Sequence, residues 1–304
     1  MRPKVRKQRH YKPWLFVMGG LLALGLGGFL AFWGYTALIR PVSSQQVVWE
    51  YDQGSLNWSV KSGVAPACNE PLRLEISPVN MSEVVAVGLP GAYRGFNYKA
   101  HGGFRMADKT AGKVDVRLPM DANLRSVSRY YESTPGNPYE LQYLADFEND
   151  CGIAFRFDHL FTLSPELQAV AEKSPPPKKN DTRRDSESEY ISVPIKAGTV
   201  IATAVGFPSA QNYGFDFGMY DRRQRNEISN NPTWAQLHKT FSAQDYHGIC
   251  WVTLLPTSDA AAAEAMAKDR NNSNTNKPFH LTSDYCSFAP YRTLDFNDGQ
   301  PTEG

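Results

Sequence analysis

The sequence lacks the common signatures of nucleotide-binding proteins and serine hydrolases. It contains no Gly-x-Ser-x-Gly element, no phosphate-binding P-loop and no dinucleotide-binding Gly-x-Gly-x-x-Gly segment. Its 304 residues also show almost no excess charge, with 32 lysines and arginines against 31 acids. Six of these basic residues lie in the first twelve positions, which leaves a net charge of −5 for the rest. We therefore expect no nucleic-acid partner, because phosphates require a basic surface.

A second absence is that of any charged residue between Trp14 and Ile39. A helix over residues 14–39 would be about 39 Å long, enough to cross an apolar membrane core of about 30 Å. Residues 1–13 form a basic tail before it, and only Arg40 follows directly. This asymmetry predicts a single-pass protein of the cytoplasmic membrane, with the N-terminus inside and the rest extracytoplasmic. A cleaved signal peptide, the alternative, would have a shorter apolar run and an Ala-x-Ala-like site.

Three small residues of the predicted span, Ala23, Gly27 and Ala31, are spaced four apart and so share one helix face. Such a face allows two helices to approach closely, which would make the chain a homodimer. The simpler explanation is that glycine and alanine are common in membrane spans.

Cysteine is scarce, and none of the four cysteines belongs to a Cys-x-x-Cys pair, which argues against a cysteine zinc site or thioredoxin-like chemistry. All four follow the predicted span, on the side where disulfides persist. Three pairings are open, and we favour Cys250–Cys286 with Cys68–Cys151. The alternative is a set of buried free thiols.

The exported part divides by composition into a β-rich region and a smaller extension. A connector at 40–70 precedes the β-rich region 71–222, whose short apolar or alternating runs are separated by Gly, Pro, Asn and Asp. These runs are 72–77, 83–89, 114–119, 139–147, 152–161, 191–195 and 199–207. The polar stretch 173–189 is expected to be an exposed loop inserted between them.

An α+β extension is expected at 223–294, and the polar tail 295–304 is expected to be disordered. Within the extension the sequence predicts a short helix at 232–240, a strand at 248–255 and a helix that begins near Ser258 and Asp259.

The order of motifs in the β-rich region resembles the lysostaphin-type (LytM-type) zinc peptidases. His101-Gly-Gly-Phe comes first, then a strand that ends in Phe-Asp-His159-Leu, the hairpin segment from Ile195 to Gly206, and Tyr-Gly-Phe-Asp216-Phe. The resemblance covers about residues 84–222. It implies a duplicated hybrid motif, that is, a β-sandwich, and a zinc site that cleaves cell-wall peptides.

The resemblance also implies which residues would form that site, and several are absent. In the family a His, an Asp four residues later and the second His of a His-x-His pair bind zinc. His101 matches the first ligand, but Arg105 stands at the second, and a guanidinium cannot coordinate a cation. The His-x-His pair falls on Gly214 and Asp216, while His159 matches a catalytic histidine.

A degenerate metal site is therefore the favoured interpretation, with no cofactor and no confident catalytic residue beyond the candidate His159. Zinc would remain conceivable only with His101, Asp216 and a recruited group such as Asp108. We expect His101, Arg105, His159 and Asp216 to line a binding groove, in which Arg105 and Asp216 could form an ion pair in place of zinc.

Three functions follow as hypotheses. The favoured one is a membrane-anchored, catalytically inactive peptidase-like protein that binds peptidoglycan or regulates another envelope protein. The first alternative is an active zinc-dependent peptidoglycan endopeptidase with altered ligands. The second alternative is a surface adhesin or structural ectodomain. His238 and His280 are expected to be structural or solvated. His247, beside Gly248 and Cys250, could approach a site, although its neighbours offer no ligand spacing.

Overall fold

The computed structural model describes residues 46–94, 97–133, 136–182, 191–238, 242–268 and 283–288. The chain divides into Met1–Gln46 and Val47–Gly304, and all described residues except Gln46 belong to the second unit. The basic tail 1–13, the predicted span 14–39 with its small-residue face, and the tail 295–304 lie outside the described residues. Among the described residues, no helix combines the length and the apolar character that a membrane crossing requires.

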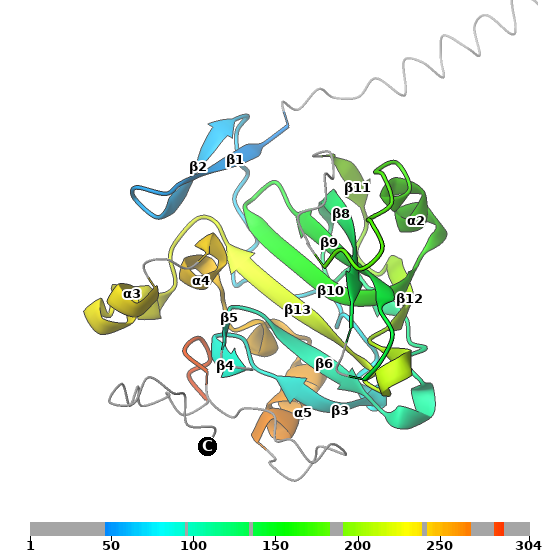
Figure 1. The fold of residues 1–304 in the computed structure, drawn as a ribbon. Coiled ribbons are helices and arrows are strands. Elements are labelled where there is room, and N and C mark those ends of the chain that lie inside the picture. Colours follow the sequence, from blue (N-terminus) through cyan, green and yellow to red (C-terminus); the bar gives the residue numbers. More distant parts are fainter. Residues whose placement is uncertain are drawn as a thin grey trace, which may run out of the picture. The chain divides into compact units, whose positions relative to one another are not determined.

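The described part is mainly β, as predicted, and is dominated by one antiparallel sheet of nine strands (Figure 1). The strands follow the order β11-β8-β9-β10-β13-β6-β3, and β12 pairs with β10 and β7. They are β3 Val84–Gly88, β6 Gly102–Met106, β7 Val116–Arg117, β8 Ala122–Glu132, β9 Glu140–Glu148, β10 Ile153–Leu163, β11 Val193–Ile195, β12 Val200–Val205 and β13 Gly214–Asp221. Two separate pairs are β1 Val48–Asp52 with β2 Asn57–Ser62, and β4 Ala92–Arg94 with β5 Asn97–Lys99.

The alternation of side chains gives the sheet an apolar face and a polar face around β10 and β13. In β13, Phe215, Phe217 and Met219 belong to the main core and are at most 2% exposed. Asp216 and Tyr220 point to the opposite face, because successive strand side chains alternate. Aspartate and arginine side chains of β10 and β9 share this second face with Asp216. The candidate functional residues therefore lie on the face of the sheet that is opposite the main core.

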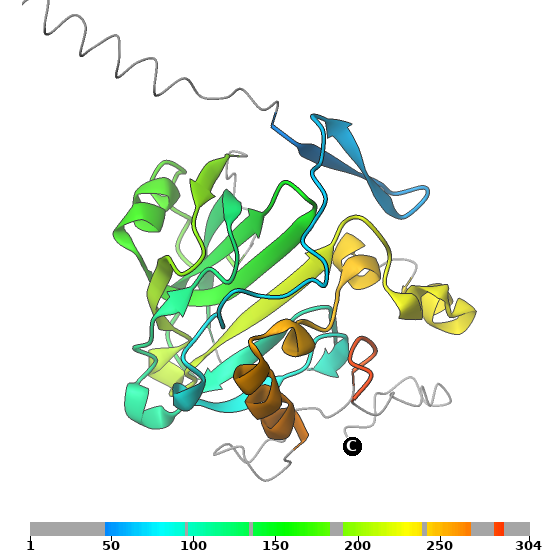
Figure 2. The same cartoon turned by 180° about the vertical axis from the view of Figure 1, so that it is seen from behind.

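The helices are short, and the last one completes the main core. They are α2 Pro165–Ala171, α3 Pro232–His238, α4 Ala243–His247 and α5 Thr257–Lys268. In Figure 2, α5 (orange) lies in front of the sheet, where it packs against β3. Ala263 and Ala267 of α5 join the same apolar cluster as the strands. The predicted extension is therefore part of one core with the β-rich region.

Two expected strands are not formed. Residues 72–77 are irregular: the amide of Leu74 donates to the carbonyl of Leu254, and that of Glu75 to Pro119. Prolines at 71 and 78 bracket this stretch and restrict it, since proline cannot donate to a ladder. The strand predicted at 248–255 is also wrong, because Trp251–Leu254 form a 3-10 helix. A short apolar run does not distinguish a buried helical turn from a buried strand.

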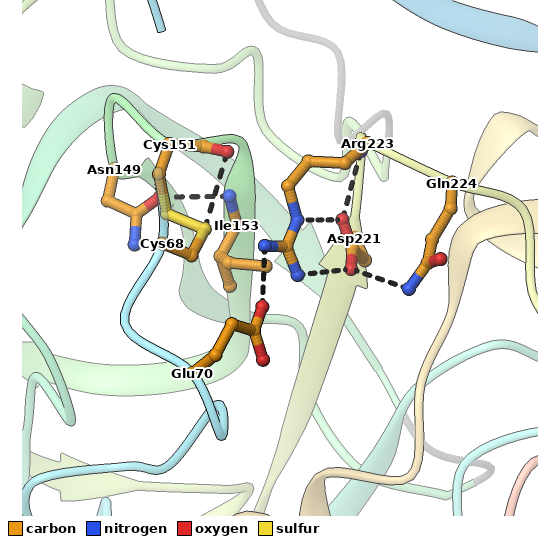
Figure 3. Close-up of a disulfide and its surroundings, with 8 residues drawn as sticks. All are labelled: Cys68, Glu70, Asn149, Cys151, Ile153, Asp221, Arg223 and Gln224. Carbon is orange, nitrogen blue, oxygen red and sulfur yellow. Dashed lines mark hydrogen bonds and ion pairs between the residues drawn. A yellow bond between two sulfur atoms is a disulfide. The ribbon is translucent and has the colours of Figure 1, made fainter. Parts of the chain in front are cut away.

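Both predicted disulfides are confirmed. Cys68 is bonded to Cys151 across 83 residues, and Cys250 to Cys286 across 36 residues. The described chain has no free cysteine. The first disulfide ties the segment after β2 to the turn between β9 and β10, next to an ion-pair group around Asp221 (Figure 3). Two complete disulfides are consistent with a protein that folds outside the reducing cytoplasm.

Candidate functional site

Three neighbouring strands bring His101, His159 and Asp216 together. His101 directly precedes β6, His159 lies in β10, and Asp216 lies in β13, which is paired to both of these strands. Asp216 is opposite Gly103 of β6 on one side and opposite Asp158 of β10 on the other. The antiparallel register therefore places residues that are far apart in the sequence at one point of the sheet.

A single carboxylate oxygen is the centre of the site. Oδ2 of Asp216 lies 3.0 Å from Nε2 of His101 and 3.6 Å from Nε2 of His159. The side chains of both histidines are 18% exposed and that of Asp216 is 28% exposed. The group is therefore neither sealed in the core nor fully solvated. We call His101, His159 and Asp216 the histidine–aspartate cluster.

The backbone at His159 explains how two consecutive residues of one strand reach the same site. His159 has a φ of +61°, in the left-handed region, and the pairing of β10 with β9 shifts register between Phe157 and Leu160. Such a bulge turns the His159 side chain toward the face that Asp158 already occupies. The amide of His159 donates to Oδ1 of Asp158 at 2.8 Å, which holds this conformation.

Tyr130 and Asp158 extend the cluster, and the sequence did not predict either. The Tyr130 hydroxyl donates to Asp158 and lies 3.2 Å from Nδ1 of His159. The Tyr130 hydroxyl has only one proton, and it donates that proton to Asp158. Nδ1 of His159 must therefore carry a proton and donate to the Tyr130 oxygen. With the protons placed in this way, His159, Tyr130 and Asp158 form one hydrogen-bonded chain. Asp158 is next to a candidate histidine in sequence, but Tyr130 lies on β8, and no local pattern links it to the site.

Arg105 is turned away from the expected partner. Its guanidinium donates to the side-chain oxygen of Asn212 at 2.9 Å and forms an ion pair with Asp108 at 3.1 Å. The ion pair with Asp108 takes the place of the one that the sequence suggested with Asp216. The Arg105 residue is only 6% exposed, so its charge is fixed among these neighbours. Asp108 is likewise engaged by Arg105 and does not join the cluster as a recruited ligand.

Gly103 allows the strands to come close beside Asp216. A Cβ atom at position 103 would lie 2.6 Å from the carbonyl oxygen of Phe215 and 3.3 Å from Oδ1 of Asp216. Any larger residue would therefore push β6 away from β13. The glycine makes the short distance between His101 and Asp216 compatible with regular strand pairing.

The site residues fit a metal only in part. The ligand set that the resemblance implies is incomplete, because Arg105 stands at one of its three ligand positions. A different set has suitable donors: one atom each of Asp158, His159 and Asp216 lies within 4.8 Å of the others, and His101 also reaches Asp216. Imidazole nitrogens and carboxylate oxygens are both ligand types that zinc uses in proteins.

The remaining described histidines are structural. Nδ1 of His238 bonds the carbonyl of Trp234 at 2.8 Å, and the His238 residue is fully buried. His247 is 1% exposed, with Nδ1 at the carbonyls of Asp221 and Gln224 and Nε2 at that of Leu56. The His247 ring thus links Leu56 to the segment 221–224, whereas the His238 ring bonds within its own helix.

Two cavities of the described part lie away from the histidine–aspartate cluster. One, of about 920 Å³, is lined by residues around Asp221, Arg223 and Tyr285. The other, of about 530 Å³, lies on the polar face of the sheet and includes Tyr220. Neither cavity is lined by His101, Arg105, His159 or Asp216, so the histidine–aspartate cluster lies outside both cavities.

No protein-family model and no curated protein sequence matches the chain.

Proposed function

We propose that this chain is a membrane-anchored extracytoplasmic protein whose peptidase-like β domain binds peptidoglycan without cleaving it. Anchoring comes from the apolar segment 14–39 and its basic flank. Export is supported by the two disulfides, which would not persist in the cytoplasm.

The conformation of Arg105 is the observation that carries the proposal. Its position corresponds to a metal-ligating aspartate in lysostaphin-type peptidases, yet here it bears a buried guanidinium. Asn212 and Asp108 hold that guanidinium at 2.9 and 3.1 Å, so the cation is built into the structure. A permanent positive charge beside a zinc site would oppose metal binding. These contacts of Arg105 support a domain that lacks the metal site implied by the resemblance.

The histidine–aspartate cluster remains suited to binding a polar ligand. Its two imidazoles and one carboxylate are partly exposed and offer both hydrogen-bond donors and acceptors. The peptide and sugar groups of a cell wall are polar and either uncharged or singly charged. Such groups can form hydrogen bonds with the donors and acceptors of the cluster. Binding at a partly exposed cluster needs no bound metal.

Co-sedimentation with insoluble peptidoglycan tests the proposal. The full-length protein in detergent should sediment with the polymer, and Asp216→Asn should weaken the interaction about tenfold, because the acceptor for both histidines is neutralised. Asp115→Asn is the matched control, since Asp115 pairs with Arg117 on an exposed surface. No sedimentation of the unmodified protein would favour an adhesin or purely structural ectodomain instead.

The second candidate is a zinc-dependent peptidoglycan endopeptidase with an altered ligand set. It is favoured by the convergence of His101, His159 and Asp216, three potential ligands on adjacent strands. Bound zinc would supply a hydroxide near neutral pH. Metal analysis of the purified protein separates the two candidates. Stoichiometric zinc that is lost in both His101→Ala and His159→Ala would overturn the non-catalytic proposal.

A further inference from the structure

The ring of His247 lies where the β1–β2 hairpin, residues 48–62, meets the rest of the β domain. His247 is the last residue of α4 and is 1% exposed. Its Nδ1 lies 3.0 Å from the carbonyl oxygen of Asp221, at the end of β13, and 2.9 Å from that of Gln224. Its Nε2 lies 3.1 Å from the carbonyl oxygen of Leu56, in the turn of the hairpin. One buried imidazole therefore joins the hairpin to the domain.

The neighbours of this ring determine how many protons it carries. All three are carbonyl oxygens, which accept hydrogen bonds and cannot donate them. A neutral imidazole has a single N–H, so one of its nitrogens would turn a lone pair toward a carbonyl oxygen about 3 Å away. The imidazolium ion has a proton on each nitrogen and can donate on both sides. The docked hairpin is thus matched to a positively charged His247.

The charged and titratable side chains around the ring are mostly paired with one another. They are Tyr51 and Asp52 of β1, Arg125 of β8, Asp146 and Glu148 of β9, Arg156 of β10, Tyr220 and Asp221 of β13, Arg222, Arg223 and Arg225 after β13, and Asp245 and Tyr246 of α4. Ion pairs join Arg156 to Asp146, Arg222 to Glu148, and Arg223 to Asp221. The three carbonyl oxygens, and not a carboxylate, are therefore the groups that hold the protons of His247 in place.

The other contacts of the hairpin do not change charge near neutral pH. The guanidinium carbon of Arg222 lies 3.9 Å from the centre of the Trp58 ring, and the Trp49 ring packs on Gly152. Leu56 itself has a φ of +58°, in the left-handed region that residues other than glycine seldom adopt. Such a conformation persists where surrounding contacts hold it. Loss of the bond from Nε2 should therefore allow the turn of the hairpin to relax.

We propose that protonation of His247 controls the docking of the β1–β2 hairpin onto the β domain. Docking needs protons on both ring nitrogens, whereas the released hairpin leaves a ring that is satisfied with one. The docked state therefore binds more protons, and docking weakens as pH rises. Histidine side chains ordinarily change charge between about pH 5 and 8, which sets the range of the effect. The Cys68–Cys151 disulfide still ties the chain after β2 to the domain, so the release is local.

Release of the hairpin would open the cavity of about 530 Å³ on the polar face of the sheet. Trp58 of the hairpin and His247 both line this cavity, together with residues of β8, β9, β10 and β13. In the extracytoplasmic protein proposed above, the pH of the surrounding medium would set the position of this wall. The inference requires neither peptidoglycan binding nor a metal, so it can stand or fail independently of both candidate functions.

Hydrogen exchange of the full-length protein in detergent tests the proposal, with mass spectrometry of peptides that cover residues 48–62. After correction for the chemical exchange rate, protection of these amides should fall about tenfold between about pH 5.5 and about pH 8, the effect of one hydrogen bond from a charged donor. In His247→Gln, protection should be low and equal at both pH values, because glutamine does not titrate. Asp245→Asn is the control, since burial raises the pKa of Asp245 to about 6, and it should retain the fall.

Nitrogen NMR of the unmodified protein provides a test that needs no substitution. At about pH 5.5, both ring nitrogens of His247 should carry a proton. His238 is the internal reference, because burial lowers its pKa and its ring should stay neutral. A single proton on the His247 ring while residues 48–62 remain protected would overturn the proposal. Protection that does not depend on pH in the unmodified protein, a fall that persists in folded His247→Gln, or one that disappears in Asp245→Asn would also overturn it.

Discussion

Two aspartates of β13, Asp221 and Asp216, have opposite environments. Asp221, at the end of the strand, is 2% exposed and receives three hydrogen bonds from Arg223 and one from Gln224 (Figure 3). Asp216, five residues earlier, has a side chain that is 28% exposed and lies between two histidines. A carboxylate saturated by a permanent cation stabilises the fold. A carboxylate that lies between two imidazoles and is 28% exposed is accessible from solvent.

The disulfide beside Asp221 should give the largest effect on stability. Cys68→Ser with Cys151→Ser removes a link across 83 residues, and chain entropy predicts a loss of about 4.5 kcal/mol in unfolding free energy. Chemical denaturation measures it. Removal of the Cys250–Cys286 link, which spans 36 residues, should cost about 0.7 kcal/mol less. A reversed order would show that native-state contacts, and not loop length, determine the two contributions.

Asp221→Asn should produce the next largest loss, about 3 kcal/mol in unfolding free energy. The change leaves Arg223 without its bidentate partner, although Arg223 also contacts Glu70 at 3.0 Å and is partly exposed. Thermal or chemical denaturation provides the measurement. Glu70→Gln, which removes the exposed partner of the same arginine, is the matched control and should cost less than about 1 kcal/mol. Equal losses for both variants would contradict the structural role assigned to Asp221.

Asp245 is a third case for comparison with Asp221 and Asp216. Its carboxylate is buried, but it forms no ion pair with an arginine among the described residues. Burial raises its pKa to about 6, and hydrogen bonds from Ser242 only partly offset this. A folded-state pKa above the unfolded value means that the folded protein binds more protons, so this contribution to stability is lost as pH rises from about 4 to about 6. We expect a loss of about 2 kcal/mol over that interval. Asp245→Asn should flatten this part of the stability–pH curve, and an unchanged curve would contradict the assignment.

Local sequence patterns predicted the strands well where apolar residues alternate over many positions. The run 152–161 overlaps β10 from Ile153 onward, and the two disulfide pairings are confirmed. The run 72–77 was wrong because its backbone groups are satisfied by Leu254 and Pro119, which no local pattern reveals.

The candidate site was predictable only in part. The order of motifs named His101, His159 and Asp216, but their contact depends on the pairing of β6, β13 and β10. Asp158 and Tyr130 were missed because the left-handed backbone of His159 is set by the bulge in β10. The direction of Arg105 was missed because a 3-10 turn at Asp108–Thr110 brings Asp108 within 3.1 Å of it.

Asp216→Asn should have the smallest effect on stability, below about 1 kcal/mol. Its partners are histidines that solvent also reaches, and partly exposed pairs contribute little. The amide keeps the size of the side chain, so the strand pairing around Gly103 should persist. Denaturation of Asp216→Asn beside Asp221→Asn therefore compares two equal chemical changes on one strand. A small loss of stability combined with weaker sedimentation on peptidoglycan would assign Asp216 to binding. A loss as large as that of Asp221→Asn would instead make the histidine–aspartate cluster a structural element, because only a carboxylate needed by the fold would be so costly to neutralise.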